Sequence, residues 1–334
     1  MPAEASSFSW SQARVFVTGA AGFIGSHLCD ALAEQGASVT ALVKYSSSGF
    51  AGHLTPSPSR ARIQIVYGNV EDAPLMLAAT RDHDVIFHLA ALIGIPYSYA
   101  ATASYVATNI SGTLNILNAA RANSPRRVVV TSTSECYGTA RYAPIDEQHP
   151  LQGQSPYSAS KIGADKLAES FHLSFGIPVA TIRPFNTFGP RQSARAVIPS
   201  VIAQALAGGT VKVGSLTPLR DFNYVSDTVS GFLRVAESDA AIGEVINIGS
   251  GREVSIGEIV DRVKTLVGRD FPVETDDARV RPEQSEVMRL LCDRSKAERL
   301  LGWAPQVSLE DGLKRTVDYI RDHLALYQTE RYAV

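Results

Sequence analysis

Three glycines directly after the first strand-like segment constrain this 334-residue chain more than any other feature. Residues 14–18 (RVFVT) have the pattern of a buried strand, and Gly19, Gly22 and Gly25 follow with the spacing GxxGxxG, where an amphipathic segment begins. In such a unit the first glycine permits a tight turn, the second lets the backbone approach a diphosphate, and the third allows close helix packing. The helix amino terminus adds free N–H groups and a positive dipole end. The motif predicts a dinucleotide site formed by Gly19, Gly22, Phe23, Ile24 and Gly25.

Strand-like and helix-like segments alternate through the first half of the chain. The expected strands are 14–18, 38–43, 63–67, 85–89, 127–131, 179–183 and 244–248, and helical patterns cover 23–35, 73–80, 99–122 and 156–175. This alternation predicts an α/β fold, a Rossmann-type doubly wound parallel sheet, with a smaller, mixed C-terminal substrate domain. The expected division is 1–185 plus 221–248 for the dinucleotide-binding domain and 186–220 plus 249–334 for the substrate-binding domain.

Composition narrows the possible partners. A net charge of −2 lacks the basic footprint of a nucleic-acid-binding protein. Cys29, Cys136 and Cys292 lie far apart without a CxxC pair, which argues against a disulfide framework and a structural metal site. The longest apolar stretch, 85–96, is shorter than the ~20 residues that a membrane helix needs, and the first residues lack the pattern of a secretory signal. We therefore expect a small-molecule partner, no nucleic acid, no membrane and no metal, and a cytoplasmic location.

Residues near the ends of later strands are further candidates for the cofactor site. Strand 38–43 is followed by Lys44 rather than by the Asp or Glu that binds the ribose 2′-hydroxyl of NAD. Lys44 either pairs with the 2′-phosphate of NADP or is a solvated surface charge. Asn69 either approaches the adenine or is a turn asparagine. The expected set is completed by Val70, Leu89, Ala90, Ala91 and Pro184. The expected cofactor is NAD(P), with NAD and NADP not distinguished.

A Tyr-x-x-x-Lys motif supplies the candidate chemistry. Tyr157 and Lys161 are expected on one face of a helix that starts with Ser155 as N-cap and Pro156 at the first position. A free tyrosine has a pKa near 10, so its phenolate at pH 7 costs roughly 4 kcal/mol, part of which a nearby ammonium offsets. Tyr157 could then accept a hydroxyl proton while hydride leaves the same carbon. Both residues are expected to be catalytic and to contact the cofactor.

The segment after strand 127–131 lies at the carboxyl edge of the sheet, where open α/β sheets bind ligands. Thr133 can hydrogen-bond a sugar hydroxyl, and Glu135 could act as a second base. The alternatives are turn capping for Thr133 and Ser134 and a solvated loop carboxylate for Glu135. Cys136 is expected to be a small buried residue rather than a nucleophile.

Five motifs together carry a resemblance to a known family. TGAAGFIGSHL, HLAA (88–91), TSE–YG, YSASK and RPFNTFGPRQ make the chain similar, over essentially its whole length, to the extended short-chain dehydrogenase/reductase family, the NAD-dependent epimerase/dehydratase group. TSE at 133–135 resembles GDP-mannose 4,6-dehydratases, and VKYSS at 43–47 resembles their NADP-binding Arg-Arg-Ser-Ser, with only Lys44 keeping a positive charge. Segments 134–168 and 183–199 most resemble the 4,6-dehydratases of nucleotide-linked N-acetylglucosamine in legionaminic-acid-type pathways.

This resemblance implies a UDP- or GDP-N-acetylglucosamine 4,6-dehydratase that recycles its nicotinamide cofactor internally. It makes Tyr157 and Lys161 the redox pair, places Thr133 near O4, and makes Glu135 the base at C5. Ser134 takes the position where some relatives have an acid for the leaving hydroxyl. A 4-epimerase, which needs no base at C5, and a 5,6-dehydratase stay open. A non-catalytic dinucleotide-binding regulator would be expected to lack part of this set, and the set is complete.

The resemblance also implies how the substrate binds and how the chain assembles. Arg220 and Arg281 would clamp the diphosphate, because a planar guanidinium binds phosphate oxygens bidentately; the alternative for each is a surface salt bridge. The implied substrate contacts are Asn186, Arg191, Val197, Arg220 and Arg281, although an ordinary helix start explains Val197 equally well. The helices expected over 99–122 and 156–175 would form a homodimer interface.

Overall fold

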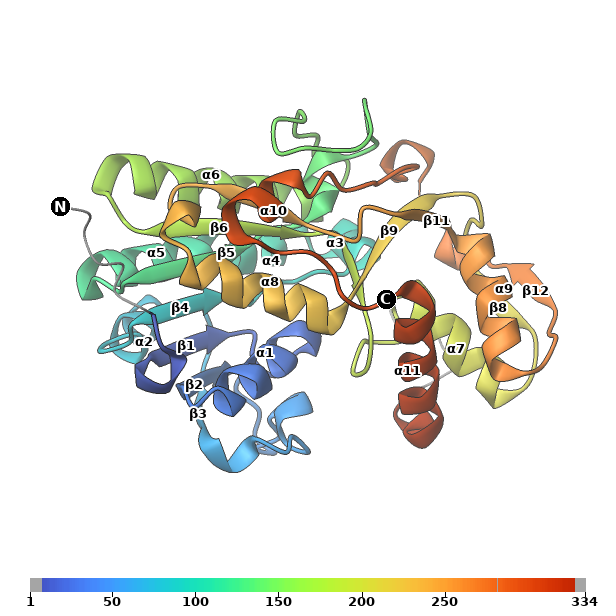
Figure 1. Cartoon of the computed structure of the whole chain (residues 1–334), viewed down its shortest axis with the longest axis horizontal. Coiled ribbons are helices and arrows are strands. Elements are labelled where there is room, and N and C mark those ends of the chain that lie inside the picture. Colours follow the sequence, from blue (N-terminus) through green and yellow to red (C-terminus); the bar gives the residue numbers. More distant parts are fainter. Residues whose placement is uncertain (1–7, 281, 328–334) are drawn as a thin grey trace.

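A seven-stranded parallel sheet forms the centre of the molecule, with the strand order β10-β6-β5-β4-β1-β2-β3 (Figure 1). The computed structural model describes residues 8–280 and 282–327. The strands of this sheet are β1 (Arg14–Thr18), β2 (Ser38–Val43), β3 (Ile63–Tyr67), β4 (Val85–His88), β5 (Arg127–Thr131), β6 (Val179–Pro184) and β10 (Val245–Ile248). Each lies within one residue of its predicted bounds, which confirms the doubly wound parallel fold.

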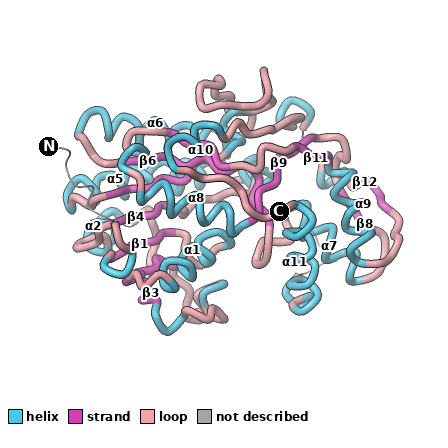
Figure 2. The backbone as a smooth tube through the Cα atoms, in the orientation of Figure 1, coloured by secondary structure: helices cyan, strands magenta, loops and turns pink. Residues whose placement is uncertain are grey.

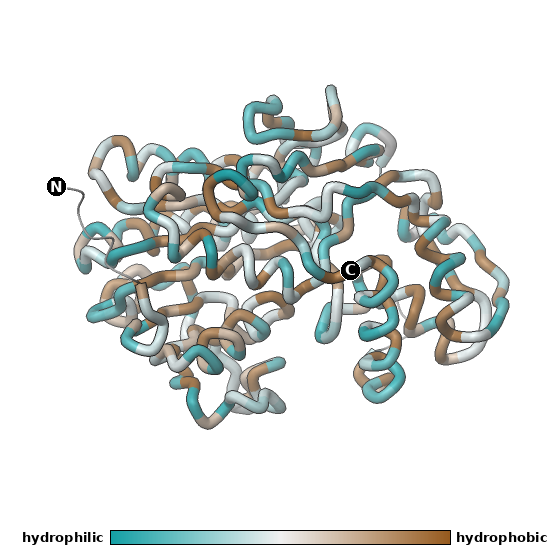
Figure 3. Tube along the Cα trace, in the orientation of Figure 1, coloured by the Kyte–Doolittle hydropathy of each residue, from teal (hydrophilic) through white to brown (hydrophobic). Residues whose placement is uncertain are grey.

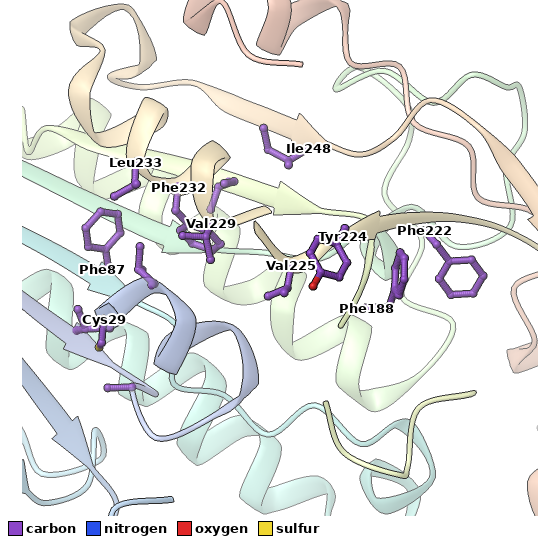
Figure 4. Packing of buried hydrophobic residues seen from close by; sticks show 14 of the residues in the cluster. Cys29, Phe87, Phe188, Phe222, Tyr224, Val225, Val229, Phe232, Leu233 and Ile248 are labelled. Carbon is purple, nitrogen blue, oxygen red and sulfur yellow. The ribbon is translucent and has the colours of Figure 1, made fainter. Parts of the chain in front are cut away.

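Helices cover both faces of the sheet because successive strand residues point to opposite sides. One face carries α1 (Phe23–Glu34) and α8 (Val225–Glu237), and the other carries α2 (Ala73–Ala79), α5 (Gly112–Asn123) and α6 (Pro156–Phe175). Along β1, Val15 and Val17 join the first core and Phe16 joins the second. In the first core Phe87 meets Phe232 with ring centroids 6.2 Å apart (Figure 4). The apolar strands run through the interior in Figure 3.

The helix expected over 99–122 is interrupted, which corrects the sequence prediction. The chain instead forms α3 (Ile95–Ala100), α4 (Thr102–Tyr105), a π-helical turn (Val106–Ser111) and then α5. The buried Asn109 in this turn accepts a hydrogen bond from Leu92 N (2.8 Å) and donates to Leu92 O (3.0 Å) and Ser160 Oγ (2.9 Å). We attribute the π turn to these contacts, because such turns are usually local insertions that serve a particular side chain.

The remaining elements form a smaller, mixed part beside the large sheet (Figures 1 and 2). Its sheets have the orders β11-β9-β7 and β12-β8. The elements are β7 (Asn186–Phe188), α7 (Val197–Ala207), β8 (Val211–Val213), β9 (Leu219–Tyr224), β11 (Glu253–Ser255), α9 (Ile256–Val267), β12 (Val273–Thr275) and α11 (Leu309–Asp322), while α10 (Ser295–Leu301) contacts β10. Because β9 pairs within the small sheet, the chain returns to the large sheet with α8, a few residues later than position 221. None of the described helices has the length and apolarity needed to span a membrane.

Candidate active site

The glycine turn between β1 and α1 has the shape that a dinucleotide diphosphate requires. Gly19 has φ +68°, and a Cβ there would lie 2.7 Å from Ala90 N. A Cβ at Gly25 would collide with the carbonyl group of Gly19. Gly22 is the N-cap of α1, and no side chain caps the described first turn, which Phe23 and Ile24 begin. The close approaches and the uncapped helix start fit a bound phosphate group, as predicted.

A buried hydrogen-bond chain fixes the segment of Leu89 and Ala90 against this turn. Thr18 Oγ1 accepts hydrogen bonds from Leu89 N and Ala90 N (both 3.1 Å). His88 joins Thr18 Oγ1 through Nδ1 (2.8 Å) and Thr113 Oγ1 through Nε2 (3.0 Å). Thr113 already donates to a backbone carbonyl, so it accepts from His88 Nε2, which leaves Nδ1 as the acceptor for Thr18. Burial lowers the pKa of His88 to about 3, which keeps the ring neutral.

The other expected cofactor contacts lie at the carboxyl edge of the sheet or next to it. Lys44 directly follows β2, is exposed, and forms no ion pair within the described ranges. Asn69 Oδ1 accepts a hydrogen bond from Glu71 N (3.3 Å), as a turn asparagine does. Val70 is buried after β3, Ala91 is half-buried after β4, and Pro184 ends β6. Both explanations of Lys44 and of Asn69 therefore still stand.

A capping box starts the helix that carries Tyr157 and Lys161. Ser155 Oγ accepts from Ser158 N (3.1 Å), and Ser158 Oγ accepts from Ser155 N (3.0 Å). Pro156 is the first helical residue, as predicted. This start places Tyr157 in the first turn of α6 and Lys161 one turn later, and both side chains are buried. Lys161 Nζ donates to Thr131 O at the end of β5 (2.6 Å).

Tyr157, Thr133 and Glu135 lie close to one another. The side chain of Thr133 hydrogen-bonds that of Tyr157, and Glu135 is near enough to act on it electrostatically. Burial raises the pKa of Tyr157 above its usual range, the bond to Thr133 lowers it, and Cys136, Glu135 and Tyr105 raise it further. Deprotonation of Tyr157 therefore depends on positive charge supplied nearby.

The residues around Glu135 form a 3-10 turn, η5 (Ser134–Tyr137), directly after β5. Thr133 is its N-cap, and Thr133 Oγ1 accepts a hydrogen bond from Glu135 N (3.2 Å), so this threonine caps the turn as well as contacting Tyr157. Ser134 is buried, and Glu135 is half-buried. Cys136 is fully buried, as expected, and burial raises its pKa to about 12, which disfavours the thiolate that a nucleophile needs.

Asn186 is the predicted substrate residue whose side-chain amide lacks a hydrogen-bond partner within the described residues. It begins β7, next to the end of β6, and its Nδ2 atom is buried without a hydrogen-bond partner within the described residues. A buried donor without a partner is costly in a folded protein. The amide is therefore available to a bound hydroxyl or carbonyl group.

The predicted arginines and Val197 lie in different surroundings. Arg220 on β9 pairs with Glu286 (2.9 Å) and donates to Leu219 O. Arg191, with φ +69°, pairs with Asp30 on α1 (2.8 Å) and so ties the loop before α7 to the large sheet. Val197 is the first residue of α7 and packs against the first core. Arg281 lies outside the described residues.

Comparison with known proteins decides the family. The family model described as GDP-mannose 4,6 dehydratase matches residues 16–316. This chain belongs to that family. The predicted membership of the NAD-dependent epimerase/dehydratase group is thereby confirmed.

Relatives in this family catalyse different reactions. A UDP-glucose 4-epimerase of Mycolicibacterium smegmatis is 34% identical over 315 residues, covering 92% of this chain and 99% of the relative. A dTDP-glucose 4,6-dehydratase of Streptomyces griseus is also 34% identical, over 320 residues, covering 94% and 96%. The crystal structure of DesIV, a dTDP-glucose 4,6-dehydratase from Streptomyces venezuelae with NAD bound, has a TM-score of 0.86 at 32% identity and covers 95% of this chain and 100% of that one. Sequence identity therefore does not distinguish a dehydratase from an epimerase. The distinction has to come from the residues of the active site.

Sequence reasoning missed several residues of this site. Tyr105 packs its ring edge against Tyr157, with centroids 6.2 Å apart, and Asn109 anchors the segment before α3. Both lie in the stretch 99–122, which was expected to be a long helix at a homodimer interface. The one available signal was a polar residue, Asn109, on a helix expected to pack against the sheet. His88 was assigned no role of its own, although it lies within the HLAA motif.

Proposed function

We propose that this protein is a nucleotide-sugar 4,6-dehydratase that binds NAD or NADP and converts UDP- or GDP-linked N-acetylglucosamine to the 4-keto-6-deoxy sugar. The observation that carries the proposal is the carboxylate of Glu135, which lies near Tyr157 on the turn that Thr133 caps. A 4-epimerase requires Tyr157 but has no use for a base at C5. The N-acetylglucosamine assignment rests on the resemblance of segments 134–168 and 183–199.

The side chains have separate roles in the proposed reaction. When bound, the nicotinamide supplies a hydride acceptor that can later return the hydride. Tyr157 accepts the proton of the C4 hydroxyl, Thr133 orients that hydroxyl, and Lys161 stabilises the phenolate. The C4 ketone acidifies the C5 proton, which Glu135 removes as the C6 hydroxyl departs as water. Hydride from C4 ends on C6 and a proton returns to C5, so net redox is zero.

The proton for the departing hydroxyl must come from Glu135 or from water. Ser134 is buried and has no acidic proton at neutral pH, so it is a poor donor for this step. Asn186 offers its amide to the sugar, and Arg220 and Arg281 clamp the diphosphate. For Arg220 this requires that the substrate phosphate compete with Glu286 for the guanidinium.

We also propose that the protein is a homodimer, as the family resemblance implies. Exposed apolar side chains in both of the segments expected at the interface, 99–122 and 156–175, support this proposal. Val106 in the π turn is 52% exposed, and Leu173 near the end of α6 is 76% exposed.

Glu135→Gln tests the dehydratase proposal. The amide keeps the size of the side chain but cannot take a proton from C5, so we expect C4 oxidation without loss of water. With UDP- or GDP-N-acetylglucosamine, reduced nicotinamide should accumulate, measured by absorbance, and dehydrated product should fall at least about 100-fold, as loss of a general base predicts. Glu71→Gln, which lies after β3 and contacts Thr108, serves as the control. Dehydration at the normal rate in Glu135→Gln would show that another group is the base.

A further inference from the structure

A buried ion pair lies next to the proposed catalytic residues and has no part in the chemistry described above. Arg183 on β6 and Asp165 on α6 are 2% and 5% exposed, and Arg183 Nη2 lies 2.6 Å from Asp165 Oδ2. Burying two charges removes both from water, and their attraction compensates only when additional hydrogen bonds complete the geometry. The partners that complete this geometry therefore indicate what the pair does.

Arg183 holds both ends of the turn that carries Glu135. Its Nε donates to Ser132 Oγ (3.2 Å), immediately before Thr133, and its Nη1 donates to Tyr137 Oη (2.7 Å) at the end of η5. The guanidinium also lies 4.6 Å from the centroid of the Tyr137 ring. The rigid, planar guanidinium thus holds Ser132 and Tyr137 in place, and Thr133 and Glu135 lie between these two residues in the chain.

Asp165 joins this arrangement to the helix of Lys161. Ser132 Oγ donates to Asp165 Oδ2 (2.6 Å), and Asp165 follows Lys161 by one turn of α6, on the same face. Asp165 Oδ1 forms no hydrogen bond within the described residues. Arg183 therefore binds only one of the two oxygen atoms of the Asp165 carboxylate.

Asp165 has a second effect, which is electrostatic and acts on Lys161. Burial lowers the pKa of Lys161, and the negative charge of Asp165 raises it. Tyr157 lies one turn before Lys161 on the same helix. His88 on β4 also acts on this region: burial chiefly lowers its pKa, and the charge of Lys161 lowers it further, so that its ring is neutral. Asp165 is therefore the carboxylate that opposes the loss of the Lys161 proton.

We propose that the Asp165–Arg183 pair positions the active site. Arg183 fixes the turn of η5, and Asp165 keeps Lys161 charged beside Tyr157. Neither side chain touches the reacting atoms, so both are positioning residues. The inference rests on the proposed roles of Tyr157 and Lys161, and it holds for dehydratase and epimerase chemistry alike.

Asp165→Asn tests the electrostatic half of this proposal, because it keeps the size and an acceptor oxygen but removes the charge. We expect Lys161 to titrate about one pH unit lower, the effect typical of losing a close opposite charge. The readout independent of catalysis is ¹³C NMR of the protein labelled at lysine Cε, with the Lys161 resonance assigned from Lys161→Met. The alkaline limb of the kcat profile should move by the same amount, which is about a tenfold loss of rate at a fixed pH on that limb.

Asp30→Asn is a matched control. Asp30 is also buried, on α1, and also joins an arginine, Arg191 (2.8 Å), and a serine, Ser57. It lies on the opposite face of the sheet from α6, so its variant should lose folding stability without moving the Lys161 titration. An unchanged Lys161 titration in Asp165→Asn, or an equal shift in Asp30→Asn, would overturn the proposal.

A second variant keeps the test decisive if Asp165→Asn does not fold. The double variant Asp165→Leu/Arg183→Met removes both charges and leaves no buried arginine without a counter-charge. Its Lys161 resonance should still titrate below the wild-type pH, by less than in Asp165→Asn because the positive charge of Arg183 is lost as well, and a titration at or above the wild-type pH would contradict the proposal. Failure of the dehydratase assignment would appear in the products and leave this titration as predicted, so the two failures are distinguishable.

Discussion

At the scale of single residues, the chemistry depends on a tyrosine whose surroundings oppose its ionisation. Burial and three neighbouring groups raise the pKa of Tyr157, while the hydroxyl of Thr133 lowers it. The sequence indicated a proton acceptor from the Tyr-x-x-x-Lys spacing, but it could not show this balance. The neighbours are distant in the chain or depend on the exact turn, and the Tyr105 contact depends on how the helices from α3 to α5 pack against α6.

Tyr157→Phe should abolish oxidation at C4, because the ring then has no hydroxyl to accept the proton. We expect the rate to fall by at least about 100-fold, the lower bound typical for loss of a general base. Product formation and nicotinamide absorbance, followed together, measure this. Dinucleotide affinity, determined by calorimetry, should change little because the glycine turn is intact. Substantial turnover by the variant would exclude Tyr157 as the base.

The ion-pair partners of the predicted arginines could not be predicted from the sequence, because the fold determines which acidic side chain each arginine contacts. Arg191 pairs with Asp30 and Arg220 with Glu286, and each partner lies far away in the chain. No local pattern specifies such pairs. Lys44 differs from these arginines. The sequence predicted its position directly after β2, but the fold does not show which group it binds.

At the scale of elements, the sequence predicted the strands of the large sheet to within one residue because each is a short apolar run bounded by glycine or polar residues, but it did not predict the short strands of the smaller part. The start of α6 was also predictable from the local sequence, because a serine at the N-cap is followed by a proline. The interruption of the helix over 99–122 was not, because the π turn is held by bonds from Asn109 to Leu92 and Ser160. Those partners belong to segments that only tertiary packing brings together.

Ser155→Ala tests whether the start of α6 matters for catalysis. Loss of the cap should cost about 1 kcal/mol of folding free energy. Because Tyr157 lies in the first turn, kcat should fall as well. Ser255→Ala is the matched control, since Ser255 forms a capping box at the start of α9, in the smaller part of the molecule. It should lose similar stability, measured by denaturant unfolding, and keep its kcat. Equal effects of both variants on kcat would contradict this account of α6.

At the scale of the whole molecule, two neutral histidines, the buried His88 and the half-buried His27, predict acid sensitivity. The folded pKa of His88 is about 3 and that of His27 about 4, both lowered chiefly by burial from 6.5. Between these values and 6.5 the unfolded chain binds more protons than the folded one, so stability falls as the pH falls through this window. For His88 alone the full effect is at most about 5 kcal/mol.

Unfolding by urea from pH 7 down to pH 4 measures this dependence. The free energy of unfolding should decrease steadily over that range. His88→Gln should be less stable at pH 7, because it disturbs the bonds to Thr18 and Thr113, but it should lose less stability on acidification. Parallel curves for the two proteins would show that His88 does not carry the effect.

The two-part architecture itself was predictable, because alternation of strands and helices stops near residue 185. The pairing of β9 within the small sheet was not, since three short strands from distant segments form it. This arrangement places Asn186 and Arg220 on neighbouring strands of one sheet, next to the carboxyl edge of the other. In the proposed function, these two side chains would contact the substrate from the smaller part.

The fate of the C4 hydrogen tests the central claim most directly. Pure protein is incubated with UDP- or GDP-N-acetylglucosamine deuterated at C4, and the product is analysed by mass spectrometry and NMR. We predict a product that has lost one water and carries the deuterium on C6. Deuterium retained at C4 would contradict the account, indicating an epimerase if the mass of the sugar is unchanged and a 5,6-dehydratase if water has been lost.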